Sequence, residues 1–136
     1  PGMLDRGWGR VVFVGTESAV DVPGDMLHYG ATKAAALALA NGLAKLTTGT
    51  EVTVNTVVGG PTYSDGVAQA VEQIAAAQGR PASDLRRYLV RESSLVRRFL
   101  ESEEIAALVA YLASARSSAT NGAAVRADGG VLRTLT

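Results

Sequence analysis

A tyrosine and a lysine four residues apart are the side chains in this sequence with the clearest chemical potential. Tyr29 and Lys33 open an Ala- and Leu-rich segment without proline, which predicts a helix over about residues 29–47. On a helix, residues at i and i+4 project from the same face. A cation beside a phenol favours the phenolate and so lowers the pKa of the phenol. Such a tyrosine can act as a general acid or base near neutral pH.

Two predicted strands end beside residues that could contact a ligand. The apolar run over residues 10–14 predicts a buried strand, and Thr16 and Ser18 follow it. Residues 51–58 predict a second strand, which the glycine-proline turn at 59–62 ends. In open α/β sheets, ligands bind outside the carboxyl ends of the strands. We therefore expect hydroxyl groups, the phenol, the ammonium and a glycine turn to converge on one site.

The remaining elements complete an alternating pattern of helices and strands. Helices are predicted from residue 64 or 65 to about 78, from a cap at 83–84 onward, and from 102 to about 114, with a third strand over 122–127. Strands separated by helices imply parallel pairing through right-handed crossovers. The sequence therefore predicts an α/β fold, a partial Rossmann-like, doubly wound parallel sheet with three visible strands and flanking helices.

Composition excludes several classes of function. The 136 residues correspond to one ordinary domain, and 13 Lys+Arg balance 13 Asp+Glu. This neutrality argues against a nucleic-acid partner, which requires a surplus of basic side chains. The chain has no cysteine and one histidine, so we expect no metal site. It has no apolar run of the ~18–20 residues that span a bilayer and no signal peptide, so we expect a cytoplasmic protein without a membrane partner.

One zone of the sequence is rich in positive charge. It holds the five arginines Arg86, Arg87, Arg91, Arg97 and Arg98. The favoured interpretation is a solvated helical face, on which these arginines pair with Glu92, Glu101, Glu103 and Glu104. The alternative is that some of these arginines bind an anionic group of a substrate.

Four segments, in the right order, resemble the short-chain dehydrogenase/reductase family. Residues 10–19 resemble the strand with the catalytic serine, Tyr29-x-x-x-Lys33 matches the Tyr-x-x-x-Lys motif, residues 55–62 resemble the segment that closes over the nicotinamide, and 118–130 resemble the last strand and its glycine turn. The resemblance covers essentially the whole chain. It implies that residues 1–136 are a single partial domain, the C-terminal half of the fold, with the N-terminal half missing.

This resemblance implies hydride transfer between NAD or NADP and a small carbonyl or alcohol substrate. Tyr29 would be the acid or base, with Lys33 lowering the pKa of that phenol and holding the ribose hydroxyls of the nicotinamide. A hydroxyl would orient the substrate oxygen. We favour Thr16 because it lies thirteen residues before Tyr29, the family spacing, and Ser18 is the alternative.

The resemblance also assigns a cofactor contact and a substrate region. The cofactor-binding residues would be Tyr29, Lys33, Gly60, Pro61 and Thr62, the last of which would bond the nicotinamide carboxamide or the pyrophosphate. Residues 63–100 would form a flap on the substrate side.

The sequence departs from the family pattern in three ways that matter. Gly59-Gly60 stands where the family usually has Pro-Gly, which predicts a looser turn. Thr16 replaces the serine and adds a methyl group. No glycine-rich phosphate loop, no residue that selects NAD or NADP, and no asparagine of the catalytic tetrad are found, and all three would lie upstream of Pro1. We therefore expect the isolated chain to bind nicotinamide cofactors poorly and to be inactive, and the choice of cofactor stays open.

Two alternatives to an enzyme remain. The predicted helix that starts near Tyr29 carries small residues near one face, namely Gly30, Ala34, Ala38 and Gly42. Small residues permit close approach of a second helix, and the resemblance implies a homo-oligomer formed through this helix. The chain would then be a non-catalytic oligomerisation or interaction fragment. The other alternative is a truncated, nonfunctional product of a gene of this family.

Overall fold

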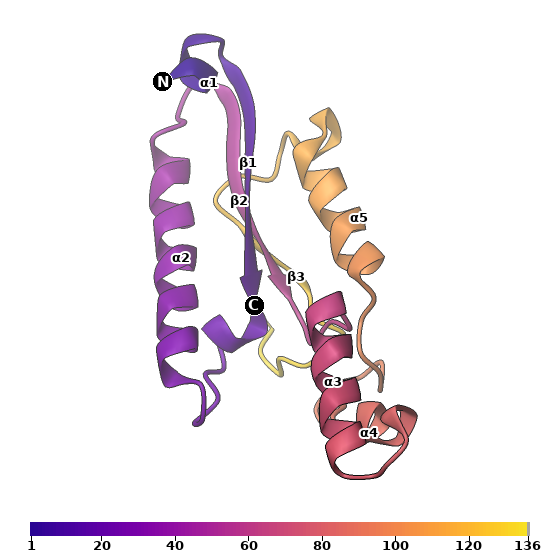
Figure 1. The fold of residues 1–136 in the computed structure, drawn as a ribbon. Helices are drawn as coiled ribbons and strands as arrows, with labels where there is room; N and C mark the ends of the chain where they lie inside the picture. Colours follow the sequence, from indigo (N-terminus) through magenta and orange to yellow (C-terminus); the bar gives the residue numbers. More distant parts are fainter. Residues whose placement is uncertain (136) are drawn as a thin grey trace.

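A computed structural model describes residues 1–135 of the chain (Figure 1). The strands are β1 (Trp8–Thr16), β2 (Glu51–Gly59) and β3 (Ala124–Ala127). The helices are α1 (Gly2–Asp5), α2 (Leu27–Lys45), α3 (Asp65–Ala77), α4 (Ala82–Tyr88) and α5 (Ser102–Ala113), with short 3₁₀ turns η1 (Glu17–Ala19) and η2 (Ala115–Ser117). The predicted order from the first strand onward is confirmed, and α1, which precedes it, was not predicted.

The three strands form one parallel sheet in the order β1-β2-β3. β2 is central, and its residues are buried from the second position to the last. Both its four valines and its polar residues Thr53, Asn55 and Thr56 are buried, as expected for a parallel strand covered on both faces. In the register, Gly59 of β2 pairs with Thr16 on one side and Ala127 on the other. All three strands therefore end at the same level of the sheet.

Helices cover both faces of the sheet, α2 on one side and α5 on the other (Figure 1). The core beneath α2 is built around the buried residues Ala40, Ala44 and Val54. Alanine has a small side chain, so α2 lies close to the strands. On the opposite face, Leu112 of α5 is fully buried. The predicted α/β class with flanking helices is confirmed.

Residues 63–100 form one long connection between β2 and α5, and backbone hydrogen bonds join its two ends. The N–H of Tyr63 donates to the carbonyl of Leu100 at 2.8 Å, and the N–H of Leu100 donates to the carbonyl of Pro61 at 2.9 Å. Between these ends, α3 and α4 pack around Val71, Ala75 and Leu85. This segment, which we call the flap, has its own small core and leaves and re-enters the fold at one point.

The arginine-rich zone of the flap differs in part from the prediction of a helical face. α4 ends at Tyr88, so Arg91, Arg97 and Arg98 lie outside any helix. Further along this zone, the N–H groups of Leu95 and Val96 donate to the carbonyl of Gly129 at 2.9 and 3.2 Å, so this part of the backbone lies against the turn after β3 and is not helical.

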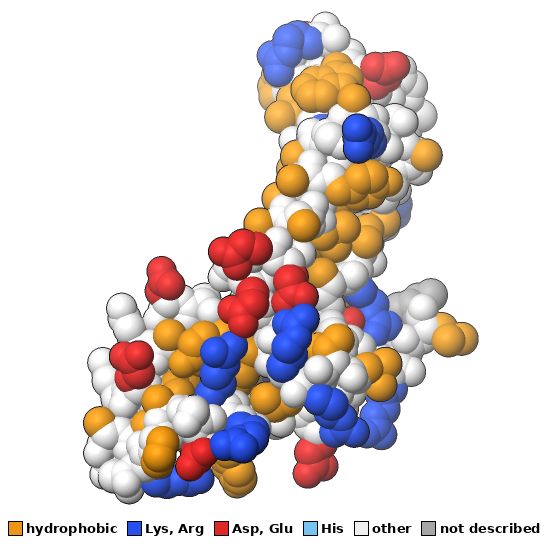
Figure 2. All heavy atoms as spheres, turned by 90° about the vertical axis from the view of Figure 1, so that its right-hand side faces the viewer, with side chains coloured by type: hydrophobic (Ala, Val, Ile, Leu, Met, Phe, Trp, Pro, Cys, Tyr) orange, Lys and Arg blue, Asp and Glu red, His pale blue; other side chains and the backbone are white. Residues whose placement is uncertain are grey.

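The ion pairs predicted for this zone are confirmed at two positions. Arg86 contacts Glu101 at 2.8 Å, and Arg98 contacts both carboxylate oxygens of Glu104, at 2.6 and 2.8 Å. Figure 2 shows Lys/Arg and Asp/Glu side chains side by side over this face. The hydrogen bond from Arg98 and that from the backbone of Glu101 lower the pKa of Glu104 to about 2.

Within residues 1–135, no helix combines the length and the apolar character that a membrane span requires.

Candidate active site

The glycine turn after β2 lies directly against the end of β3. The N–H of Gly60 donates to the carbonyl of Ala127 at 3.0 Å. A Cβ placed on Gly60 would lie 2.5 Å from the carbonyl oxygen of Asp128, which is closer than real Cβ contacts. Gly60 is therefore required by this approach of two backbones. At Gly59 a Cβ would meet ordinary contacts of 3.5 Å or more, and the strand pairing on both sides holds this residue.

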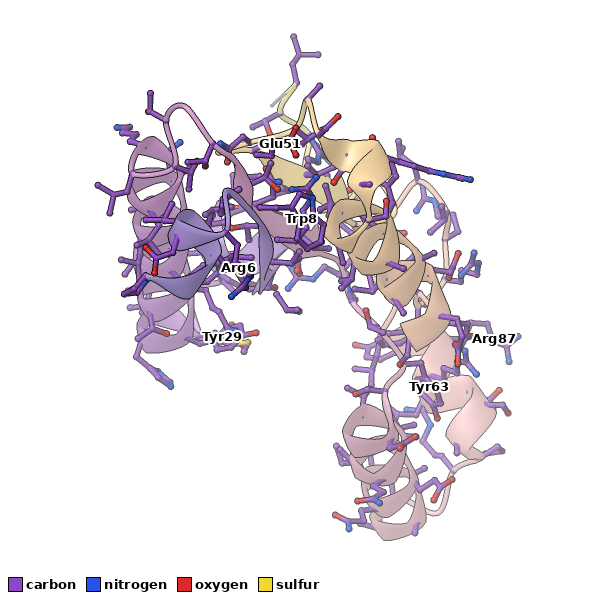
Figure 3. The ribbon with its side chains drawn as sticks, turned by 90° about the horizontal axis from the view of Figure 1, so that it is seen from above. Arg6, Trp8, Tyr29, Glu51, Tyr63 and Arg87 are labelled. Carbon is purple, nitrogen blue, oxygen red and sulfur yellow. The ribbon has the colours of Figure 1, made fainter. Side chains whose placement is uncertain are left out.

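The side chains of Tyr29 and Lys33 lie on the same face of α2, as their spacing predicts. The Lys33 Nζ is 5.7 Å from the centroid of the Tyr29 ring, and both side chains are half-buried in the first turns of the helix. Figure 3 shows Tyr29 on the α2 side of the molecule and Tyr63 and Arg87 on the side of α3 and α4. Tyr29 and Lys33 thus lie in the N-terminal turns of α2, the end of the helix that comes after η1 in the chain.

Gly30 connects Tyr29 to the loop after β1. A Cβ on Gly30 would lie 2.5 Å from Cγ1 of Val22 and 2.8 Å from the carbonyl oxygen of Ser18. The absence of a side chain therefore lets η1 and the following loop pack against the start of α2. This corrects one expectation from the sequence, because Gly30 serves contact within the chain and is buried, whereas Ala38 and Gly42 are exposed.

The two candidate hydroxyls differ in their surroundings. Oγ1 of Thr16 donates to Oε2 of Glu17 at 2.6 Å and accepts a hydrogen bond from the N–H of Ser18 at 3.3 Å. The Ser18 hydroxyl is buried and lies 3.4 Å from Oε1 of Glu17. Thr16 is half-buried and pairs with Gly59 at the strand ends. The Thr16 hydroxyl is therefore the better placed of the two to meet a ligand.

Thr62 also has a defined hydrogen bond. Its hydroxyl donates to the carbonyl of Gly60 at 2.9 Å, which leaves the oxygen free to accept a hydrogen bond. An accepting oxygen at this position fits an amide N–H donor such as a carboxamide. Pro61 fixes the turn through its carbonyl, which accepts from Leu100.

A hollow of about 450 Å³ lies beyond η1, and none of the candidate site residues lines it. It lies between the loop after η1, the flap and the C-terminal tail, and it is lined by Val20, Asp21, Ser93, Val131, Leu132, Arg133 and Thr134. A second, more apolar hollow of about 550 Å³ is lined by α1, α2 and residues such as Val52 near the start of β2. This second hollow is at the opposite end of the strands and is separate from the candidate site.

Two residues of this region make contacts that the sequence did not indicate. Glu17 is buried directly after β1 and contacts Thr16, Ser18 and Arg91, and an acidic residue at the carboxyl end of a strand is a usable signal for such contacts. Asn55 belongs to the segment that resembles the nicotinamide-binding region. In the structure it is buried, and its side chain joins β2 to the segment that leads into β3. Its Nδ2 donates to the carbonyl of Thr120 at 2.7 Å, and its Oδ1 accepts from the N–H of Ala123 at 3.1 Å.

The parallel sheet with aligned strand ends, the Tyr29–Lys33 pair on one helix face and the glycine turn against the last strand form an open α/β arrangement, in which ligands bind outside the carboxyl ends of the strands. A family model described as "Enoyl-(Acyl carrier protein) reductase" matches residues 1–132. The chain therefore belongs to the short-chain dehydrogenase/reductase family.

Individual relatives agree with this assignment. The chain is 39% identical over 136 residues to an uncharacterized oxidoreductase, YvaG, of Bacillus subtilis, covering 98% of this chain and 52% of YvaG. It is 29% identical to a D-beta-hydroxybutyrate dehydrogenase of Cupriavidus necator, covering 96% of this chain and 50% of the enzyme. The chain thus spans about half the length of the curated relatives it matches.

The fold also matches solved structures. The structure of L-sorbose reductase from Gluconobacter frateurii, complexed with NADPH and L-sorbose, superposes with a TM-score of 0.92 at 27% identity. That match covers 99% of this chain and 51% of the reductase. The structure of a betaketoacyl-ACP reductase, assigned only provisionally to that activity, matches with a TM-score of 0.72 at 32% identity, over 95% of this chain and 49% of that one.

Proposed function

We propose that the protein carrying this chain is an oxidoreductase that uses NAD or NADP to interconvert a small carbonyl compound and its alcohol. Two observations support the proposal: the strands end at one edge of the sheet, and the start of α2 packs against the loop after β1. Thr16 pairs with Gly59 at the strand ends, and Tyr29 is tied to the same loop because Gly30 packs against Ser18. Lys33 lies on the face of α2 that carries Tyr29.

The residues at this edge fit a nicotinamide nucleotide. Among residues 1–135, no carboxylate pairs with Lys33, so its ammonium remains available for the hydroxyls of a ribose. Thr62 keeps an oxygen that can accept a carboxamide N–H. Tyr29, Lys33, Gly60, Pro61 and Thr62 would hold the nicotinamide end, and the bound cofactor supplies the hydride.

The protein side of the reaction is then a proton transfer with positioning. Tyr29 gives a proton to the substrate oxygen during reduction and takes it back during oxidation. Lys33 stabilises the negative charge that develops on the phenol oxygen. Thr16 orients the substrate oxygen, and the flap covers the substrate. NADPH is the first cofactor to test because the solved L-sorbose reductase holds it, and NAD is the second.

A second candidate function, an oligomerisation fragment without catalysis, rests on one observation. Large apolar side chains are exposed on α2 and directly after it: Leu39 of α2 is 57% exposed, and Leu46, the residue after the helix, is 69% exposed. Burial of these leucines against a second copy of α2 would make the protein a homo-oligomer. Oligomerisation by itself is compatible with the first candidate, so the two candidates differ in whether the protein catalyses a reaction.

The experiment measures turnover and cofactor binding in the protein that carries this chain. Oxidation of NADPH or NADH is followed by absorbance with a panel of ketones, aldehydes and ketoses. Removal of the acid from Tyr29 in Tyr29→Phe is expected to lower kcat by about 10²- to 10⁴-fold. Tyr88→Phe is a matched control, because Tyr88 is 76% exposed on the flap. Turnover that survives Tyr29→Phe unchanged would contradict the assignment.

Binding and size measurements separate the two candidates. NADPH fluorescence titration of the isolated chain is expected to show weak binding, because residues 1–135 contain no glycine-rich phosphate loop ahead of a helix. Sedimentation of the same sample reports its oligomeric state. A stable oligomer in a protein that shows neither binding nor turnover would favour the second candidate.

A further inference from the structure

A small hollow on the flap, which we call the arginine hollow, is lined by four arginines. Its volume is about 170 Å³, and it is lined by Ser83, Val90 and Phe99 together with Arg86, Arg87, Arg97 and Arg98. Arg86 and Arg87 belong to α4, whereas Arg97 and Arg98 belong to the segment that leads from α4 to α5. Figure 3 shows Arg87 on the side of α3 and α4, away from Tyr29. The arginine hollow is therefore separate from the candidate active site.

Three of these arginines are held by carboxylates that do not line the hollow. The partners of Arg86, Arg87 and Arg98 are, in this order, Glu101 at 2.8 Å, Asp84 at 2.6 Å and Glu104 at 2.6 Å. A guanidinium group has five N–H donors, so an ion pair on one side leaves donors on the other. These pairs thus fix the three guanidinium groups without using all of their donors.

Arg97 differs from the other three arginines in its charge balance. Within residues 1–135, no carboxylate lies within ion-pair distance of Arg97. Its Nη1 donates to the carbonyl of Glu92 at 2.8 Å, which orients the guanidinium but does not neutralise it. The excess positive charge of the arginine hollow is therefore that of Arg97.

The backbone of Arg97 is held in an unfavourable conformation. Its φ angle is 55°, and among residues 1–135 it is the one non-glycine residue with a positive φ. The N–H of Arg97 donates to Oγ of the buried Ser94 at 3.2 Å, and the two residues before Arg97 are bonded to Gly129. Backbone strain of this kind is concentrated at functional sites, where surrounding contacts maintain it. Here it accompanies a side chain that lines the hollow with three other arginines.

One wall of the hollow is rigid. The guanidinium carbon of Arg86 lies 3.9 Å from the centroid of the Tyr63 ring, a cation–π contact. The Tyr63 ring in turn packs edge-on against Phe99, which is buried and lines the hollow, with 5.7 Å between the ring centroids. Donors that are already fixed lose little freedom when a ligand binds.

These features suit a phosphate group. The planar fork of a guanidinium matches the oxygens of a phosphate, which it binds in a bidentate manner. A hollow lined by one sign of charge concentrates that potential, and an anion bound there would relieve the repulsion among the arginines. The volume is below the ~300–1,000 Å³ of pockets that enclose a drug-sized ligand. It therefore fits one phosphate group and not a whole nucleotide.

We propose that the arginine hollow binds a phosphate group, as free phosphate or at the end of a small phosphorylated molecule. Arg97 supplies the charge that no carboxylate balances, and Arg86 and Arg98 supply fixed donors. A bound phosphate would join α4 to the segment that follows it and so stiffen the flap. The inference goes beyond the proposed function, because it concerns a second site and does not depend on turnover.

Calorimetric titration of the protein that carries the chain tests this site. The probes are inorganic phosphate and glycerol 3-phosphate, with glycerol as the uncharged comparison. Ionic strength is held constant with chloride, because salt screens exposed charges. Saturable binding of at least one phosphate probe is expected, with none of glycerol. Tighter binding of glycerol 3-phosphate would identify a phosphorylated molecule as the ligand, and tighter binding of inorganic phosphate would identify the free ion.

A matched pair of variants assigns the binding to the hollow. Arg97→Asn removes the guanidinium but keeps a residue type that tolerates positive φ, so the fold should be preserved. It is expected to weaken phosphate binding by about 10-fold or more. Arg116→Asn makes the same charge change at an exposed arginine of η2 that does not line the hollow, and affinity should stay unchanged.

Two results would overturn the proposal. One is the absence of saturable binding of either phosphate probe to the folded wild type. The other is a phosphate affinity in folded Arg97→Asn equal to that of the wild type, because any binding would then lie elsewhere in the protein. Binding that depends on Arg97 in a protein without turnover would leave this site standing while the proposed function fails.

Discussion

Gly60 and Asp128 meet backbone to backbone, at a distance that admits no side chain on Gly60. The Cβ position of Gly60 lies 2.5 Å from the Asp128 carbonyl oxygen and 2.7 Å from its Cα. The Asp128 turn is itself rigid, because its carboxylate accepts hydrogen bonds from the N–H groups of Gly130 and Leu132 at 3.1 and 3.0 Å. Burial opposes the charge on Asp128, but these bonds and Arg126 outweigh it and hold its pKa below the usual value.

Gly60→Ala is therefore expected to destabilise the protein. The added methyl group must push two backbones apart, which costs about 1–3 kcal/mol of unfolding free energy. Urea unfolding followed by circular dichroism measures the change. Gly66→Ala is the matched control, because a Cβ there meets nothing within 4 Å, and in helix α3 alanine should raise stability by up to about 1 kcal/mol. Equal stability of both variants would contradict the close approach.

Gly30→Ala should impair activity by moving Tyr29. The methyl group would collide with the carbonyl of Ser18 and with Val22, so the start of α2 must shift away from η1. A displacement of about 1 Å at a reacting group can cost about 100-fold in rate. The measurement is kcat beside that of Gly42→Ala, a substitution in the same helix at a position with open space. A Gly30→Ala enzyme with normal kcat would show that this packing does not position the phenol.

Asn55 is expected to be a determinant of stability with a small direct role in catalysis. Asn55→Ala leaves the Thr120 carbonyl and the Ala123 N–H without their partner in a buried place. The loss should be about 2–6 kcal/mol of unfolding free energy, since two groups lose their partner and each unsatisfied buried group costs about 1–3 kcal/mol. Asn41→Ala removes one exposed bond to Gly122 and should cost less than about 1 kcal/mol. Thermal unfolding curves of the two variants measure both losses of stability. A loss in Asn55→Ala no larger than that in Asn41→Ala would contradict the prediction.

The ion pair of Arg98 and Glu104 should be visible in the acid titration of the protein. The folded-state pKa of Glu104, about 2, lies below the ordinary value of 4.5. Its contribution to stability is thus present above pH 4.5 and is lost as the pH falls toward 2. In Arg98→Gln, NMR titration should show the midpoint of Glu104 moving up toward 4.5, with a weaker loss of stability between these pH values. A midpoint that stays near 2 would show that Arg98 is not the cause.

Local patterns in the sequence were sufficient to predict the elements and the Tyr29–Lys33 pair. The spacing of four residues puts these side chains on one face of any helix, whatever surrounds it. Alternation of strands and helices likewise implies a parallel sheet, which the register of β1, β2 and β3 confirms. Hydrophobic runs and turn residues carry this information within short windows, so no distant contact is needed to interpret it.

Contacts between distant segments could not be predicted in this way. The sequence determined that Gly30 lies in a helix, but only the packing of η1 showed that the glycine faces Ser18 and not a second helix. The same holds for Glu17, whose burial depends on an arginine 74 residues further along the chain. By itself the sequence determined the class of fold and the chemistry of one helix face. The tertiary structure decided which hydroxyl, carboxylate and arginine meet there, because those distances depend on how whole elements pack.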